Sequence, residues 1–278
     1  MRHGAATVFL AVLSAATALA AAPPGDKASP PAQAAAAGFH ALVYVEDFAR
    51  LDIGASEAGG NHAWWTVPPR WDRTPANWQS AYALSDHVAT LATRAADGWR
   101  AINMISNITN TSGENQPQSG SFLHGYFEAR LKFDMPTGAW PAFWLFSSKH
   151  MATANPRDWS EIDIVEGQGH TPGRLYFTLH WWEDTQRNHQ NSRPDIRMPA
   201  AFDPTQFHKY GLLWVPGKVT WYVDDQAVLS APTWPVNETD PVSIIISAQA
   251  NGWSKPNNAS FGEARSISVQ VSSVKVWQ

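Results

Sequence analysis

The chain contains no cysteine and few charged residues. Without cysteine it has no disulfide, no thiolate nucleophile and no Cys-ligated zinc or iron–sulfur centre. Charged residues make up 16% of the 278 residues and the net charge is −4. Nucleic acids and anionic membranes bind basic patches, so neither is expected as a partner of this mildly acidic chain. The 44% apolar content excludes an intrinsically disordered protein.

Tryptophan is unusually abundant. The chain has 15 Trp, more than its 6 Tyr or its 12 Phe. Each buried indole N–H needs a hydrogen-bond partner, so a core alone does not need this many indoles. We therefore expect part of the tryptophan to line a binding surface.

The first residues of the chain have the pattern of a secretory signal. In residues 1–22, Arg2 precedes an apolar run that is shorter than the ~20 residues needed to span a bilayer, and small residues follow it. Residues 23–38 are rich in Pro and Ala and are predicted to be a disordered linker. The sequence thus predicts a secreted protein, extracellular or periplasmic, with one folded domain over residues 39–278.

The folded part of the chain is predicted to be all-β. Short alternating or β-branched runs are separated by Gly, Pro, Asn and Asp, and a 3.6-residue periodicity is not evident. The predicted strands are Leu42–Phe48, His87–Thr93, Phe122–Phe133, Ala139–Phe146, Glu161–Glu166, Arg174–Trp182, His208–Val215, Lys218–Val223, Val242–Ala248 and Ile267–Trp277. Many strands in one domain indicate a β-sandwich or barrel. Residues 55–79 and 186–201 lack a pattern and are expected to form binding loops.

One predicted strand carries three carboxylates, Glu161, Asp163 and Glu166. In an ideal strand Glu161 and Asp163 share one face, and the intervening isoleucines occupy the other. Continued alternation would bury Glu166 on the isoleucine side, which is costly for a carboxylate without a partner. A β-bulge at Ile164-Val165 absorbs one residue and returns Glu166 to the face of the other two. The sequence therefore predicts a bulge and a row of three carboxylates.

Such a row of like charges is destabilising, because neighbouring carboxylates raise one another's pKa. Two glutamates on one face suit glycoside hydrolysis with retention, in which the carboxyl groups lie about 5–5.5 Å apart. The repulsion is expected to raise the pKa of one of the two glutamates and keep it protonated as the general acid. Two alternatives are an acidic solvent-facing edge strand and a calcium site.

This segment resembles glycoside hydrolase family 16, whose signature is Glu-x-Asp-x-x-Glu. Further segments resembling the family are His124–Lys132, Gly138–Leu145, Thr178–Trp181, Phe207–Trp214 with Trp221–Asp224, and Val269–Gln278. The resemblance covers residues 42–278 and implies a concanavalin-like jelly-roll β-sandwich with a concave substrate cleft. It implies that Glu161 is the nucleophile, that Asp163 assists it and that Glu166 is the acid/base.

The family signature also occurs in a form that is one residue shorter and has no bulge. The bulged form present here is similar to that of the laminarinase-, agarase- and carrageenase-like branches. The resemblance implies a secreted, endo-acting, retaining hydrolase of β-linked polysaccharide, with β-1,3-glucan the first candidate substrate. A galactan, a bacterial exopolysaccharide, transglycosylation and a non-catalytic lectin are the alternatives, and the intact carboxylates favour an enzyme over a lectin. Many members hold a structural calcium through an Asp where this chain has Ser272. We therefore expect no catalytic metal and no required cofactor, with a structural calcium as an open alternative, and a monomer whose partner is the polysaccharide.

Aromatic and polar residues around the carboxylates are the candidates for binding sugar, because indole rings stack on the C–H faces of sugars. The candidates are Trp140, Trp144, Trp159, His180, Trp182 and Arg130, with Trp64, Gln249, Trp65, Asn251 and Trp253 as weaker ones. The resemblance places His180 close to the catalytic residues. Arg130 is expected either to reach the cleft or to pair with Glu128. Trp214, Trp221 and Trp277 are expected in the core.

Overall fold

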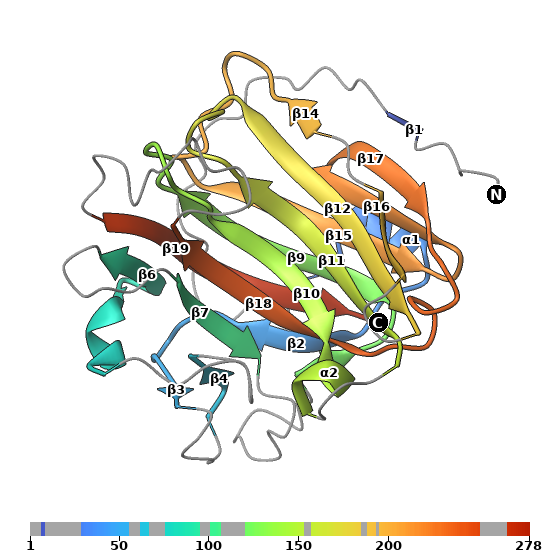
Figure 1. Ribbon diagram of the computed structural model, residues 1–278, viewed down its shortest axis with the longest axis horizontal. Helices are drawn as coiled ribbons and strands as arrows, with labels where there is room; N and C mark the ends of the chain where they lie inside the picture. Colours follow the sequence, from blue (N-terminus) through green and yellow to red (C-terminus); the bar gives the residue numbers. More distant parts are fainter. Residues whose placement is uncertain are drawn as a thin grey trace.

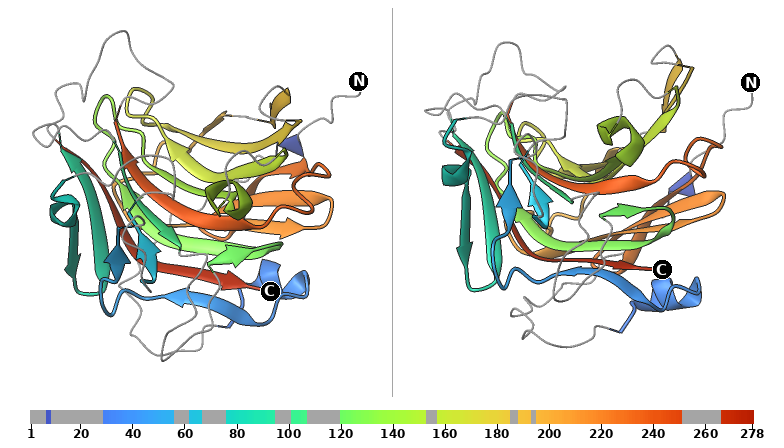
Figure 2. Two further views of the ribbon diagram at one scale, coloured as in Figure 1. Left: turned by 60° about the horizontal axis from the view of Figure 1, so that its bottom comes forward. Right: turned by 90° about the horizontal axis from the view of Figure 1, so that it is seen from below.

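The computed structural model describes residues 7–8, 29–55, 62–66, 76–94, 101–106, 120–152, 157–184, 188–192, 195–250 and 266–278. Two large, mainly antiparallel sheets are stacked face to face, as Figure 2 shows from the edge. Helices are short: α1 (Ala32–Ala36), α2 (Ser148–Ala152) and the 3₁₀-helix η2 (Trp78–Ala81). No helix in the described ranges is long and apolar enough to cross a membrane.

The first sheet has nine strands in the order β1-β17-β16-β15-β9-β19-β6-β5, with β2 paired to β19. Its strands are β1 (Thr7–Val8), β2 (Leu42–Glu46), β5 (Tyr82–Ser85), β6 (Val88–Arg94), β9 (Gly125–Phe133), β15 (His208–Val215), β16 (Lys218–Val223), β17 (Gln226–Pro232) and β19 (Ser266–Trp277). Strands β15 and β16 form a hairpin that turns at Pro216-Gly217.

The second sheet has ten strands in the order β13-β12-β11-β10-β18-β7-β4-β3, with β14 paired to β12 and β8 to β18. Its strands are β3 (Ile53–Gly54), β4 (Trp64–Trp65), β7 (Ala101–Ser106), β8 (Ser121–Phe122), β10 (Ala142–Ser147), β11 (Trp159–Gly167), β12 (Arg174–Glu183), β13 (Asn188–Ser192), β14 (Asp195–Arg197) and β18 (Val242–Gln249). Strands β10, β11 and β12 lie side by side in the middle of the view in Figure 1.

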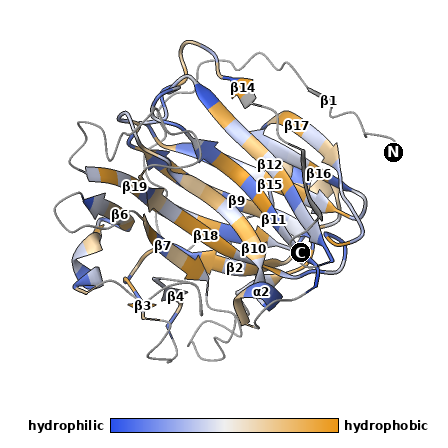
Figure 3. Cartoon of the chain, in the orientation of Figure 1, coloured by the Kyte–Doolittle hydropathy of each residue, from blue (hydrophilic) through white to orange (hydrophobic). Residues whose placement is uncertain are grey.

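The core lies between the sheets, and its composition follows from side-chain alternation along each strand (Figure 3). Phe143 and Leu145 of β10 and Ile162 of β11 face Leu212 and Trp221 of the first sheet within one buried cluster. The other face of the second sheet, here called the open face, carries a separate aromatic-rich cluster. That cluster consists of Trp65, Ile105, Ala142, Trp144, Phe146, Met151, Trp159 and Ile245.

The segment before the sandwich differs from the prediction. Part of the predicted linker forms α1, whose Ala34 is fully buried against Tyr126 and Trp277. The Gln33 amide donates to the Tyr126 hydroxyl at 2.7 Å. The expectation of disorder is therefore wrong for residues 29–38, because a small alanine lets the short helix pack closely on the first sheet. The rest of the predicted signal and linker lies outside the described residues, apart from β1, which pairs with β17.

An ion pair fixes the start of β15. His208 Nδ1 lies 2.7 Å from Asp224 Oδ2, and the other Asp224 oxygen accepts the main-chain N–H of Lys209 at 2.9 Å. Burial lowers the pKa of His208, but the hydrogen bond and charge of Asp224 outweigh it and the pKa is raised overall. Burial raises the pKa of Asp224, but the hydrogen bonds from His208 and Lys209 outweigh it and the pKa is lowered overall. Both groups are therefore charged over a wide pH range.

Asp224→Asn tests this pair. The contribution of Asp224 is present above its unfolded pKa of about 3.9 and is lost as pH falls through its lowered folded value. The contribution of His208 is complete below about pH 6.5 and is lost as pH rises through its raised folded value. We expect the variant to lose about 1 kcal/mol of unfolding free energy at pH 5.5 and clearly less at pH 9. Asn tolerates the positive φ of 47° at this position, so the backbone is not strained.

Guanidinium denaturation of wild type and variant at the two pH values measures this difference. An equal loss at pH 5.5 and pH 9 would contradict the assignment of the stabilisation to the charged pair.

Candidate active site

Strand β11 contains a bulge that places three carboxylates on the open face. Asp163 pairs with Thr178 of β12 and Glu166 pairs with Tyr176, so three steps on β11 oppose two on β12. The residues between them, Ile164 and Val165, are both fully buried in the core between the sheets. The bulge predicted at Ile164-Val165 is confirmed, and it gives Glu166 the same face as Glu161 and Asp163.

The bulge is tied to the opposite sheet. The indole N–H of Trp221, on β16 of the first sheet, donates to the main-chain carbonyl of Asp163 at 2.9 Å. Trp221 is fully buried, so this bond crosses the interior of the sandwich. The position of Asp163 therefore depends on the packing of both sheets.

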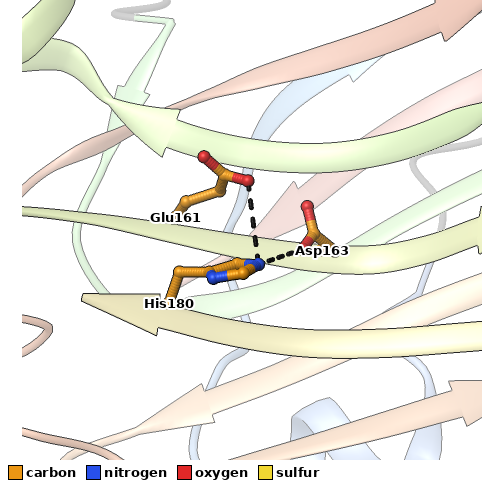
Figure 4. A group of neighbouring side chains, drawn as sticks. All are labelled: Glu161, Asp163 and His180. Carbon is orange, nitrogen blue, oxygen red and sulfur yellow. Dashed lines mark ion pairs between the residues drawn. The ribbon is translucent and has the colours of Figure 1, made fainter. Parts of the chain in front are cut away.

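A ring nitrogen of a histidine or a tryptophan lies beside each carboxylate. His180, opposite Glu161 on β12, places Nε2 3.2 Å from Asp163 Oδ2 and 4.0 Å from Glu161 Oε1 (Figure 4). The Trp140 indole N–H donates to Glu166 Oε1 at 2.7 Å. The structure thus brings His180 and Trp140, two of the predicted sugar-binding residues, into contact with the carboxylates themselves.

The three carboxylates share one electrostatic environment. Burial raises the pKa of Glu161 well above its usual value, and the charges of Asp163 and Glu166 raise it further. Protons leave such a cluster in steps that belong to the whole group of carboxylates. The cluster therefore keeps a proton at a higher pH than an isolated carboxyl would, which an acid/base mechanism requires. The raised pKa expected for Glu166 stays a prediction.

A stack of rings extends from the carboxylates along the open face. His180 stacks on Trp182 with ring centroids 5.7 Å apart, and Trp182 stacks on Trp159 at 5.0 Å. The ring of His150, on α2, follows at 4.6 Å from Trp159. Trp159 is only 5% exposed, whereas Trp182 is half-buried. Trp182 is thus the ring of this stack that offers more surface to a sugar.

Trp144 lies on the other side of the carboxylates, opposite Asp163 on β10. Its indole N–H donates to Ser247 Oγ at 2.8 Å, and Ser247 donates to Asn103 Oδ1 at 2.7 Å. Sequence reasoning missed Asn103, although it is a polar residue between the buried Ile102 and Met104 of β7. A polar residue between two buried apolar residues of a strand has its side chain on the opposite face, and this pattern could have placed Asn103 on the open face.

Gln249 acts through its main chain. It is the half-buried last residue of β18, and its main-chain carbonyl accepts the main-chain N–H of Trp140 at 2.8 Å. This contact positions the indole that bonds Glu166. The weaker candidate Trp65 lies in the open-face cluster and is 6% exposed, while Asn251 and Trp253 lie outside the described residues.

Two predicted sugar-binding residues lie elsewhere. Trp64 is fully buried in the core between the sheets, where its indole N–H donates to Glu46 Oε2 at 2.9 Å. Arg130 lies on β9 of the first sheet, with its guanidinium 4.5 Å from the Phe207 ring centroid and 3.1 Å from Ser272 Oγ. The binding role predicted for both residues is wrong, because neither lies on the open face.

The comparisons with known proteins agree with this geometry. Residues 76–264 match the family model of glycosyl hydrolases family 16. The chain belongs to this family. The family 16 chain is 31% identical to an endo-1,3-1,4-beta-glycanase EglC of Rhizobium meliloti over 206 residues, which are 73% of this chain and 41% of that protein. It is 29% identical to the endo-1,3-1,4-beta-glycanase ExsH of the same organism over 205 residues, 72% of this chain and 40% of that protein.

The chain thus spans about two fifths of the length of these curated relatives. The solved structure of a laminarinase from Flavobacterium sp. UMI-01 aligns with a TM-score of 0.62 at 20% identity, covering 86% of this chain and 100% of that one. This likeness confirms the predicted jelly-roll β-sandwich.

Trp221→Phe tests the link between the sheets. Leaving the Asp163 carbonyl without its donor should cost about 1–3 kcal/mol of unfolding free energy beyond the effect of the smaller ring. Because Asp163 is then free to shift beside Glu161, we expect the kcat of any glycosidase activity of the chain to fall about tenfold. Denaturant unfolding and initial rates measure the two effects.

Trp214→Phe is the matched control. Trp214 is also fully buried in the first sheet, but its indole N–H has no hydrogen-bond partner among the residues that the structure describes. Equal losses of stability and kcat in the two variants would show that the Trp221–Asp163 bond is unimportant.

Proposed function

We propose that this family 16 protein is an endo-acting glycoside hydrolase that cleaves β-1,3-linked glucan with retention of anomeric configuration. The observation that carries the proposal is the bulged strand β11, which aligns Glu161, Asp163 and Glu166 on one face. Two glutamates on one strand face, with an aspartate between them, match the requirement of a double displacement for a nucleophile and an acid/base.

In the first step, the Glu161 carboxylate attacks the anomeric carbon and the glycosidic bond breaks, while Glu166 gives its proton to the leaving oxygen. In the second step, Glu166 takes a proton from water, and the water oxygen attacks the anomeric carbon and releases Glu161. The Trp140 N–H orients Glu166 through Oε1. His180 contacts Asp163, which orients Glu161 from the neighbouring position on the strand.

The substrate class is supported by the aromatic open face and by the relatives. The half-buried Trp182, stacked on Trp159, offers an indole face for the C–H side of a sugar. The two relatives named above are described as endo-1,3-1,4-beta-glycanases, which favours a β-glucan. The Arg2-led apolar segment supports export of the protein. Ser272, which bonds Arg130, offers no carboxylate for a structural calcium, and this supports an enzyme that works without that ion.

Hydrolysis of a polysaccharide panel tests the substrate and the stereochemistry together. We expect oligosaccharides of mixed length to be released from a β-1,3-glucan before they are released from agarose, κ-carrageenan or cellulose. Proton NMR of the first product should show the β anomer, because the water attacks the face that Glu161 leaves. The α anomer as the first product would contradict retention, and cleavage of another polymer alone would contradict the substrate.

Glu161→Gln tests the nucleophile. The amide cannot form the glycosyl-enzyme, so we expect kcat to fall about a thousandfold or more with an unchanged fold. Glu128→Gln is the matched control, because Glu128 is also a buried glutamate whose pKa is raised by burial but lies on the first sheet. Activity above about a tenth of wild type in folded Glu161→Gln would remove Glu161 from the mechanism.

A further inference from the structure

Asp240 is a buried aspartate whose carboxylate bonds the start of the catalytic strand β11. It is 2% exposed and lies between β17 and β18, outside the carboxylate row on the open face. Its Oδ2 accepts the main-chain N–H of Ser160 at 2.8 Å and the Ser160 hydroxyl at 3.1 Å. Its Oδ1 accepts the Ser147 hydroxyl at 2.9 Å. Asp240 therefore joins β11 and β10 through two serines.

The position of this contact follows from the register of the two strands. Strands β10 and β11 pair from Ala142 opposite Glu166 to Phe146 opposite Glu161, and the pairing stops there. The next residues in the same register are Ser147 and Ser160. In place of a direct pair between them, both bond the Asp240 carboxylate. Asp240 thus closes the ladder at the step immediately beyond Glu161.

The same carboxylate is connected to the ring stack. Ser147 Oγ, which donates to Asp240, accepts the main-chain N–H of His150 at 3.1 Å. This bond holds α2 where the His150 ring lies 4.6 Å from the Trp159 ring. Trp159 and Glu161 flank Ser160 on the strand. Three contacts thus lead from Asp240 through Ser147 and His150 to Trp159, the residue that precedes Ser160.

Retaining a carboxylate in this place is costly. Burial raises the pKa of Asp240, although the hydrogen bonds from Ser160 and Ser147 offset part of that effect. Lys149 Nζ lies 4.0 Å away and is itself half exposed to solvent. A neutral side chain could close the end of a ladder at a lower desolvation cost. A carboxylate offers two oxygens with several acceptor sites, which is what the three converging donors require.

We propose that Asp240 is a positioning residue that fixes the start of β11, and through Ser160 sets the place of the nucleophile Glu161. This inference rests on the proposed function. Asp240 touches no reacting atom, so its loss should lower kcat and leave the binding of substrate nearly unchanged. The conservative amide should restore much of the effect, because Asn keeps an oxygen for the Ser160 N–H.

Steady-state kinetics of Asp240→Ala and Asp240→Asn test the proposal on the polysaccharide that the wild type cleaves. We expect Asp240→Ala to lower kcat at least tenfold with KM within twofold of wild type. We expect Asp240→Asn to retain kcat within threefold. If Asp240→Ala does not fold, Asp240→Ser takes its place, with an expected loss in kcat of at least fivefold. The proposal would be overturned by an unchanged kcat in Asp240→Ala or its replacement Asp240→Ser. It would also be overturned if Asp240→Asn lost as much kcat as Asp240→Ala.

Asp224→Ala is the matched control. Asp224 also accepts a main-chain N–H at a strand start, that of Lys209, but on the first sheet. Its loss should also destabilise the protein, because the ion pair with His208 is lost and alanine is strained at a φ of 47°. We expect its kcat to stay within twofold of wild type, measured well below the unfolding temperature of every variant. A tenfold loss in this control as well would assign the effect of Asp240 to general destabilisation.

Amide hydrogen exchange separates this inference from the proposed function. We expect Asp240→Ala to lose protection at Ser160 and Glu161, and Asp240→Asn and Asp224→Ala to retain it. A wild type inactive on every polysaccharide would contradict the proposed function, and the exchange data would still decide whether Asp240 holds the strand. Unchanged protection in Asp240→Ala would show that it does not.

Discussion

Successive side chains of a strand point to opposite faces, and β11 has to depart from that alternation once to align its three carboxylates. The departure places both Ile164 and Val165 in the core and shifts the register of β11 against β10 as well as β12. Strand β10 pairs with Val165 and skips Ile164, whereas β12 pairs with neither residue. The bulge is also held from across the sandwich, where Trp221 binds the carbonyl of Asp163. The first sheet therefore takes part in building a site that lies on the second.

The contacts to the carboxylates come from ring nitrogens. An indole N–H bonds Glu166, and an imidazole lies between Glu161 and Asp163. An indole donor stabilises a carboxylate without a full opposite charge, so the pKa is not driven far down as it would be beside an arginine. Burial and the charges of Asp163 and Glu166 raise the pKa of Glu161, so the three carboxylates together hold a proton to a higher pH. The proposed mechanism requires an ionised Glu161, so this shared proton has to reside on Glu166 when the reaction begins.

The carboxylate row could be predicted because alternation and the cost of burying Glu166 leave one local solution. Other features depend on contacts that are distant in the sequence. Trp64 and Trp65 are adjacent in a two-residue strand, too short for a periodic pattern to tell which indole enters the core. The position of Arg130 depends on which sheet β9 joins. Asp240 bonds a residue 80 positions away, which no local pattern reveals.

The abundance of tryptophan has a physical explanation in these contacts. A core was not expected to hold many indoles, because each buried N–H needs an acceptor. In this fold several indoles have one: Trp64 bonds Glu46, Trp140 bonds Glu166, Trp144 bonds Ser247 and Trp221 bonds the Asp163 carbonyl. A large rigid ring fills apolar volume and at the same time delivers one donor at a fixed place. Two of these four donors bond a carboxylate or carbonyl of the catalytic row itself. The same side chains that pack the two faces of the second sheet thus also set the positions of the groups that react.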